Sequence, residues 1–150
     1  MTESVVVLGS GYAGAGAIRS LERSLDDGSE LTWISAVDHH LVLHESHRCI
    51  RDPSVAAKIT IPVEEVKPSS TAFVRARVTD IDTDAREVEL ADRDPVAYDY
   101  LVVGLGSRTA FYGIRGLAEY AHTLKSLEDA LGIHEALTRA GEGASRADPA

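Results

Sequence analysis

The stretch that decides the fold lies near the N-terminus and reads Val5-Val6-Val7-Leu8-Gly9-Ser10-Gly11-Tyr12-Ala13-Gly14. Its first four residues are apolar and mostly β-branched, which predicts a buried strand. The glycines then follow the pattern G-x-G-x-x-G. In a dinucleotide-binding turn the first glycine allows the tight turn, the second admits a pyrophosphate, and the third lets the following helix pack on the strand. A glycine turn without any ligand is the alternative interpretation.

The residues after this turn complete a βαβ unit. A helix is predicted by apolar residues at steps of one, three and four, namely Ala17, Ile18, Leu21 and Leu25. Gly28 is expected to end that helix, and residues 31–34 supply a second β-rich run. A strand, helix and strand within about 30 residues indicate a parallel sheet with a right-handed crossover.

The residue that would bind a ribose is less well defined. A dinucleotide turn is usually followed about 20 residues later by an acidic residue that accepts hydrogen bonds from ribose hydroxyls. That position falls on Ser35, and the nearest carboxylate is Asp38. Both stay candidates, with a solvated loop carboxylate as the alternative role for Asp38. No basic residue occupies positions 35–38, which argues against a cofactor with a 2′-phosphate.

The middle of the chain predicts irregular structure followed by antiparallel strands. Weak periodicity and three prolines in residues 39–68 favour loops with short helices at 55–59 and 63–66. Three strand-like stretches then follow at 73–82, 87–90 and 96–98, separated by polar turns. Residues 100–103 read as a buried central strand. The predicted fold class is therefore α/β, a Rossmann-like three-layer fold with a parallel sheet and an inserted three-stranded antiparallel β-meander.

Near the C-terminus, Ser126-Leu127-Glu128-Asp129 reads as a capping box that opens a helix. After Gly141 the residues are small, polar and aperiodic, which predicts a linker-like tail.

Composition narrows the function classes. A net charge of −9 disfavours nucleic acid and anionic lipid as partners. Only three of the fifteen cations are lysines (Lys58, Lys67, Lys125), a balance similar to that of proteins from salt-adapted cytoplasms, which predicts a fold that loosens when salt is removed.

No apolar run is long enough to span a membrane, and no secretory signal is recognisable, so a cytoplasmic location is expected. The single cysteine, Cys49, excludes an internal disulfide.

Three later segments and one dipeptide after the second strand carry a resemblance to a known family. The run Tyr98-Asp99-Tyr100-Leu101-Val102-Val103-Gly104-Leu105-Gly106-Ser107 resembles the strand that follows the meander in the FAD domain of two-dinucleotide-binding flavoproteins. The segments Phe111-Tyr112-Gly113-Ile114 and Thr123-Leu124-Lys125-Ser126, together with His40-Leu41, are similar to type II NADH dehydrogenases. The similarity covers nearly all of the chain. It departs at Ser35 and Gly104, where the family more often has an acid and an alanine.

The resemblance implies an N-terminal FAD-binding portion over residues 1–140, with the tail at 141–150. FAD would be the cofactor, NADH the co-substrate of the complete enzyme and a quinone the electron acceptor. The implied cofactor-binding residues are Gly9, Gly11, Tyr12, Ala13 and Gly14 at the pyrophosphate, Ser35 or Asp38 at the ribose, Val78 at the adenine, and Gly104, Leu105 and Gly106 close to the cofactor. The resemblance assigns no catalytic acid or base, because the flavin carries the chemistry.

The resemblance also implies what this chain lacks. No second strand, glycine turn and helix for NADH is recognisable, so we expect the 150 residues alone to be an incomplete FAD domain with exposed apolar surface. Peripheral contact with the cytoplasmic face of a membrane would come from a part of the enzyme beyond this chain. A homodimer is an open alternative for the oligomeric state.

The sequence leaves other functions open. Four histidines and Cys49 lie within residues 39–49, but the sequence misses the H-E-x-x-H pattern of zinc proteases because Arg48 stands at the last position. His40 and His44 on one helical face would be the remaining metal site, and no metal is expected. A non-catalytic FAD or NAD module and a sulfide:quinone reductase-like flavoprotein stay open as alternatives.

Overall fold

The computed structural model describes residues 3–26 and 28–146 of the chain. The residues form two compact units, the first from Met1–His40 with Ile61–Gly106 and the second from Leu41–Thr60 with Ser107–Ala150.

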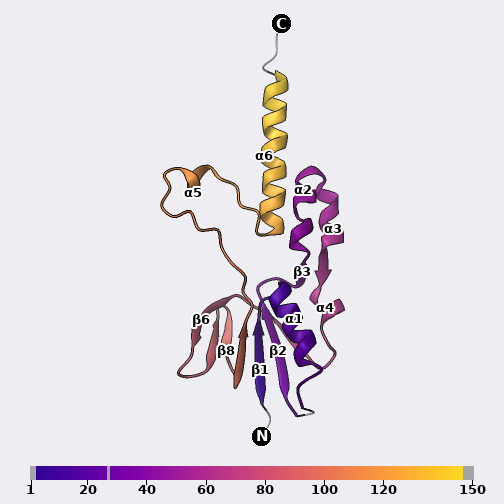
Figure 1. Ribbon diagram of the computed structural model, residues 1–150, viewed down its shortest axis with the longest axis vertical. Helices are drawn as coiled ribbons and strands as arrows, with labels where there is room; N and C mark the ends of the chain where they lie inside the picture. Colours follow the sequence, from indigo (N-terminus) through magenta and orange to yellow (C-terminus); the bar gives the residue numbers. More distant parts are fainter. Residues whose placement is uncertain (1–2, 27, 147–150) are drawn as a thin grey trace. The chain divides into compact units, whose positions relative to one another are not determined.

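A four-stranded parallel sheet forms the centre of the first unit (Figure 1). Its order is β5-β2-β1-β9, with bounds Ala72–Arg75, Glu30–Ser35, Ser4–Leu8 and Tyr100–Val103. All three neighbouring pairs are parallel. Because the strands are parallel, their C-terminal ends meet at one edge of the sheet, and the glycine turn begins there at the end of β1.

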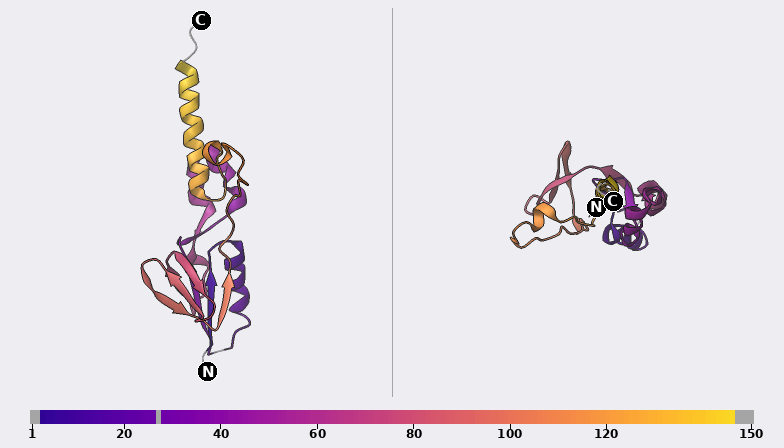
Figure 2. Two further views of the ribbon diagram at one scale, coloured as in Figure 1. Left: turned by 90° about the vertical axis from the view of Figure 1, so that its left-hand side faces the viewer. Right: turned by 90° about the horizontal axis from the view of Figure 1, so that it is seen from above.

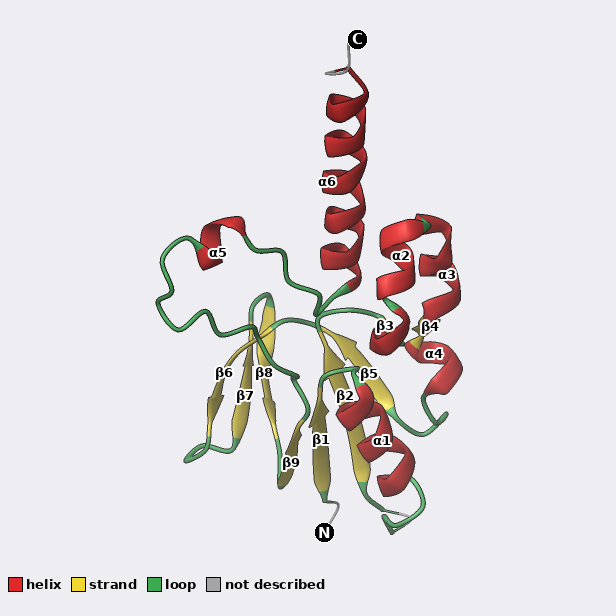
Figure 3. Cartoon of the chain, turned by 45° about the horizontal axis from the view of Figure 1, so that its top comes forward, coloured by secondary structure: helices red, strands yellow, loops and turns green. Residues whose placement is uncertain are grey.

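Alternating side chains bury both faces of this sheet. On one face, Val5, Val7 and Trp33 form a core with Ile18 from helix α1 (Tyr12–Leu21). On the other face, Val6 and Leu8 pack with residues of the β-meander. The meander consists of β6 (Val78–Asp82), β7 (Glu87–Leu90) and β8 (Arg93–Ala97). Helix α1 therefore covers one face of the parallel sheet (Figure 3) and the meander packs on the other, which confirms the predicted three-layer fold class.

The structure differs from the sequence prediction in three places of this unit. Helix α1 ends at Leu21, well before Gly28, and the Ser24 hydroxyl donates to the Ser20 carbonyl in the turn that follows. The predicted strand at 73–82 is two strands, because Ala76 still donates to β2 while the chain then turns into the meander. The strand β9 is an edge strand, so the prediction of a buried central strand was wrong. Tyr100 and Val103 on it are 57% and 59% exposed.

Short helices and one long helix form the second unit. The short helical segments are η1 (Leu43–Glu45), α2 (His47–Arg51), η2 (Pro53–Val55), α3 (Ala56–Ile59) and α5 (Leu117–Tyr120). Strands β3 (His39–Leu41) and β4 (Thr60–Pro62) pair with one another, and α4 (Val63–Val66), which follows β4, belongs to the first unit, where Val63 lies in the core. The core of the second unit contains Cys49, Val55, Ile59 and Ala130. The predicted short helices at 55–59 and 63–66 are confirmed in position.

Helix α6 (Leu127–Arg146) is one continuous helix, drawn in yellow in Figure 2. The predicted capping box opens it, since the Ser126 hydroxyl accepts from the amide of Asp129 while the Asp129 carboxylate accepts from the amides of Ser126 and Lys125. The helix continues beyond Gly141, so residues 141–146 are helical rather than irregular as predicted. Residues 147–150 of the predicted tail lie outside the described residues.

Candidate functional site

The glycine turn between β1 and α1 is held by packing at two of its three glycines. Gly9 has a φ of +93°, and a Cβ on it would collide with the carbonyl oxygen of Gly104. A Cβ on Gly14 would collide with the carbonyl oxygen of Gly9. These two glycines therefore permit the turn and the close approach of helix and strand, as the motif predicts.

Gly11 is different, because the protein itself does not require a glycine there. Its backbone has φ −73° and ψ −172°, an extended conformation that any residue adopts. A Cβ on Gly11 would meet no atom within 4 Å. The space beside Gly11 is thus open in the protein, and a glycine at this position leaves the backbone accessible to a ligand.

Helix α1 begins directly at this open position. Gly11 is its N-cap, and no side chain caps it. The first turn of the helix contains no acidic residue. The N-terminal end of a helix carries a partial positive charge and amide groups directed outward, so this end is suited to an anion such as a pyrophosphate.

Hydrogen bonds from β2 fix the backbone of the turn. The indole Nε1 of Trp33 donates to the carbonyl of Gly9 at 2.8 Å in a buried environment. The amide of Gly9 donates to the carbonyl of Ile34 at 2.7 Å. Because strand β2 holds both the amide and the carbonyl of Gly9, the protein itself fixes the start of the turn.

Ser35 occupies the position where an acid is usual, and its side chain is turned into the protein. Its hydroxyl donates to the Ser10 hydroxyl at 2.9 Å, which donates in turn to the carbonyl of His39 at 2.8 Å. The Nδ1 of His40 lies 2.8 Å from the Ser10 carbonyl, and the Tyr12 ring meets the His40 ring edge to face. Ser35 and Ser10 are only 5% exposed, so this network anchors the loop after β2 to the turn.

Asp38 presents its carboxylate at the same edge of the sheet. Its Oδ2 accepts a hydrogen bond of 2.9 Å from Nη1 of Arg75, the last residue of β5, and its Oδ1 lies 3.3 Å from Nδ1 of His39. The hydrogen bond with His39 and the positive charge of Arg75 lower the pKa of Asp38 below its ordinary value. Both members of the ion pair are more than half exposed, so the carboxylate remains ionised and open to solvent at neutral pH.

The remaining predicted residues lie at the same end of the sheet or next to it in sequence. Tyr12 and Ala13 are exposed in the first turn of α1. Gly104 follows β9, donates to the carbonyl of Leu8 at 2.9 Å, and has no room for a Cβ, because that atom would lie 2.9 Å from the Leu8 oxygen and 3.0 Å from the Gly14 nitrogen. Leu105 and Gly106 are exposed beyond it.

Val78 begins β6 and pairs with Leu90. It lies two residues after Ala76, where the chain leaves the parallel sheet for the meander. Contact of its backbone with an adenine stays a prediction.

The histidine-rich segment shows no metal geometry. Nδ1 of His40 contacts the Ser10 carbonyl, while His44 and His47 belong to the second unit. In residues 3–26 and 28–146 no three His, Cys, Asp or Glu side chains are placed to hold one metal ion. Cys49 is fully buried, and this burial raises the pKa of its thiol.

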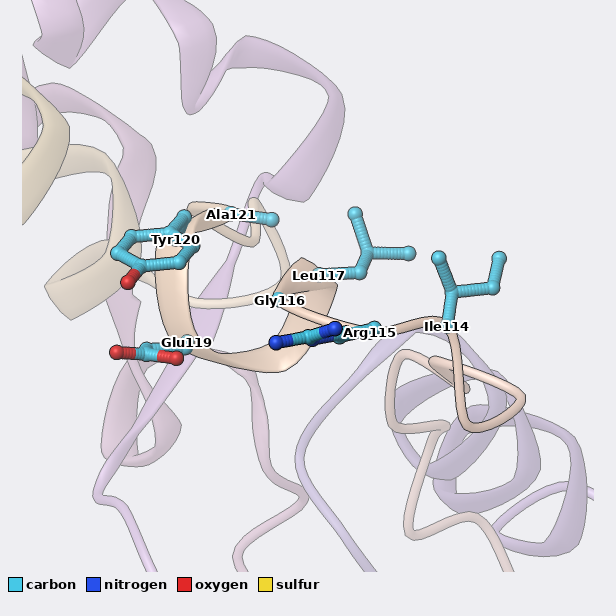
Figure 4. Close-up of a pocket in the computed structure, with 7 residues that line it drawn as sticks. All are labelled: Ile114, Arg115, Gly116, Leu117, Glu119, Tyr120 and Ala121. Atoms are coloured by element: carbon cyan, nitrogen blue, oxygen red, sulfur yellow. The ribbon is translucent and has the colours of Figure 1, made fainter.

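A separate hollow of about 720 Å³ lies in the second unit (Figure 4). The labelled side chains all come from one loop and its short helix α5. The hollow is lined by Ile114, Arg115, Gly116, Leu117, Glu119, Tyr120 and Ala121. It contains none of the predicted site residues.

Sequence reasoning missed three residues of the turn region, namely Ser10, Trp33 and Arg75. The first two act through hydrogen bonds that no motif encodes. Arg75 was detectable in principle, because it ends a strand whose C-terminal end must meet those of β1 and β2 in a parallel sheet.

Comparison with known proteins agrees with this geometry. The profile of the pyridine nucleotide-disulphide oxidoreductase family matches residues 3–146. The chain belongs to this family. The predicted resemblance is thereby confirmed at the level of the oxidoreductase family.

Relatives and structural neighbours in this family are about three times as long as the chain. A type II NADH:quinone oxidoreductase of Staphylococcus saprophyticus is 34% identical over 127 residues, which cover 83% of this chain and 31% of that protein. The same enzyme of Staphylococcus haemolyticus is 32% identical over 130 residues, covering 85% and 32%. The chain therefore spans about a third of the length of these curated relatives.

Two solved structures share the fold of the chain. The sulfide:quinone oxidoreductase of Aquifex aeolicus superposes with a TM-score of 0.80 at 23% identity, covering 94% of this chain and 33% of that one. NDH2 of Plasmodium falciparum, solved with NADH, gives a TM-score of 0.81 at 19% identity, covering 97% and 30%.

Proposed function

We propose that this chain is the N-terminal portion of the FAD-binding domain of an NADH:quinone oxidoreductase, and that its glycine turn holds the FAD pyrophosphate. The observation that carries this proposal is the open space at Gly11. Gly9 and Gly14 are explained by packing within the protein, whereas no contact within the protein requires a glycine at Gly11, and the approach of a ligand to its backbone would supply the reason. That space lies at the N-terminus of α1, where an anionic pyrophosphate is stabilised.

The residues of the turn supply binding and orientation. Amides at the start of α1 would face the pyrophosphate, and no acidic side chain in the first turn opposes it. Trp33 fixes the Gly9 carbonyl and thereby keeps the turn in one shape before binding. A bound FAD would supply the redox chemistry between NADH and a quinone, while the residues of the turn would bind and orient it.

The names of the Staphylococcus relatives favour NADH and a quinone as the substrates of the complete enzyme. Sulfide chemistry by a thiol of this chain is disfavoured, because Cys49 is buried in the core of the second unit and its thiol pKa is raised. None of the helices in the described part of the chain combines the length and apolar character needed to cross a membrane. We propose peripheral contact with the cytoplasmic face of a membrane, through parts outside this chain, and a homodimer as the oligomer to test.

The test compares two glycines of the same helix region. Gly11→Val places two methyl groups in the space proposed for the pyrophosphate, whereas Gly16→Val places them on an exposed site where a Cβ also meets nothing within 4 Å. We expect Gly11→Val to lose bound FAD and Gly16→Val to keep it, measured as flavin absorbance per protein in the full-length protein. Circular dichroism checks that both variants fold. Equal flavin content in the two folded variants would contradict the proposal.

A further inference from the structure

The ion pair between Asp38 and Arg75 joins two segments that are 37 residues apart in the chain. Arg75 stands directly beside Ser35 in the parallel register of β5 and β2. The Ser35 side chain is committed to Ser10, whereas Arg75 extends to the Oδ2 of Asp38 at 2.9 Å. The pairing of β5 with β2 thus places the Arg75 guanidinium beside Asp38, the only carboxylate in the loop between β2 and β3.

Both the backbone and the side chain of Asp38 make contacts that fix its position. Its backbone carbonyl accepts from the amide of Val63 at 2.8 Å, and its Oδ1 lies 3.3 Å from His39. With Arg75 on Oδ2, one backbone contact and two side-chain contacts fix the residue. An ionised carboxylate offers about four acceptor directions, so two contacts leave acceptor capacity for further donors.

We propose that Arg75 is a positioning and specificity residue of the dinucleotide site, which holds the Asp38 carboxylate so that it accepts hydrogen bonds from the ribose hydroxyls of the adenosine half. This inference rests on the proposed binding of FAD. Vicinal hydroxyls are two donors on adjacent carbons, and a carboxylate with a fixed plane matches them better than a rotating one.

The charge of Arg75 has a second effect on the same site. A dinucleotide carries a negatively charged pyrophosphate, and Asp38 adds another negative charge at the same end of the sheet. The guanidinium on Oδ2 offsets the charge of Asp38 without covering it, since Asp38 remains 56% exposed at its side chain. Removal of Arg75 therefore frees the carboxylate to rotate and leaves its charge uncompensated near an anionic ligand.

The experiment measures binding of two flavins to the full-length apoprotein by quenching of flavin fluorescence. The first is FAD, and the second is an FAD analogue whose adenosine carries no 2′- or 3′-hydroxyl. The proteins are the parent, Arg75→Ala, Arg75→Lys, Asp38→Ala and the double variant of Asp38→Ala with Arg75→Ala. The matched control is Arg93→Ala, which removes an exposed arginine from β8 of the meander.

We expect the parent to bind FAD more tightly than the analogue and Arg75→Ala to lose about fivefold in FAD affinity, the scale of an exposed ion pair. The affinity of Arg75→Ala for the analogue should fall less than its affinity for FAD, because the analogue keeps the pyrophosphate that the uncompensated charge of Asp38 opposes but has no ribose hydroxyls to lose. Arg75→Lys should recover part of the loss because it keeps the charge but not the forked geometry. The double variant should bind FAD no more weakly than Asp38→Ala alone, and Arg93→Ala should match the parent.

Several results would overturn the proposal. A parent that binds FAD and the analogue equally well would show that the ribose hydroxyls are not recognised. This comparison uses only the parent protein, so it does not depend on the folding of any variant. Equal losses for both flavins in Arg75→Ala would assign Arg75 a purely structural role, and tighter FAD binding would mean that it blocks Asp38. A parent that binds neither flavin would overturn the proposed function as well, whereas the other outcomes leave FAD binding standing.

Discussion

Replacing Trp33 with phenylalanine tests whether β2 holds the glycine turn. Trp33 is fully buried, and its Nε1 donates at 2.8 Å to the carbonyl of Gly9. Phenylalanine keeps an aromatic ring in the core between α1 and the sheet but has no donor for that carbonyl. The variant therefore removes one buried hydrogen bond and a small part of the packing.

The magnitude follows from these two losses. A buried carbonyl left without a donor costs about 1–3 kcal/mol. The smaller ring buries about 40 Å² less apolar surface, which adds about 1 kcal/mol. We therefore expect the free energy of unfolding to fall by about 2–4 kcal/mol.

The assay is urea unfolding of the purified chain, followed by far-ultraviolet circular dichroism. The slope of the unfolding free energy against urea concentration should be the same in all variants. The matched control is Phe73→Leu, which removes the edge-to-face partner of Trp33 at 6.1 Å between ring centroids but leaves the Gly9 hydrogen bond in place. The control should lose about 1 kcal/mol. A Trp33→Phe variant that loses no more than this control would refute the idea that the indole hydrogen bond holds the turn.

Two further predictions concern α6 and the isolated chain. Asp129→Ala should lower the free energy of unfolding by about 1 kcal/mol at pH 7, because the carboxylate accepts from the amides of Lys125 and Ser126. Hydrogen bonds from the Lys125 amide, the Thr123 side chain and Ser126 lower the pKa of Asp129 in the folded state, so its contribution is present above the ordinary pKa near 4 and is lost as the pH falls below it. Urea unfolding at pH 7 and pH 3 checks this, and an equal difference between parent and variant at both pH values would contradict it. The 150-residue chain alone, with added FAD and a quinone, should not oxidise NADH, because it contains one dinucleotide turn; steady-state NADH consumption would disprove this.

The sequence alone determined the features that depend on neighbouring residues. The strand, glycine turn and start of α1 follow from β-branched residues and glycines within ten positions. The Asp82 carboxylate accepts from the amides of Asp84 and Ala85, so the turn between β6 and β7 was predictable as well. The capping box at Ser126 was predictable for the same reason, since each contact spans three or four residues.

Tertiary structure decided the features that depend on distant residues. The break between β5 and β6 and the edge position of β9 depend on which strands pair. The position usually held by an acid became a buried Ser35 bonded to Ser10, and the nearby Asp38 acquired an arginine from the end of β5. No local pattern encodes these contacts, because the parallel sheet brings strand ends together across tens of residues. Local propensity thus fixed the turn that faces the proposed ligand, and strand order fixed which charged groups stand beside it.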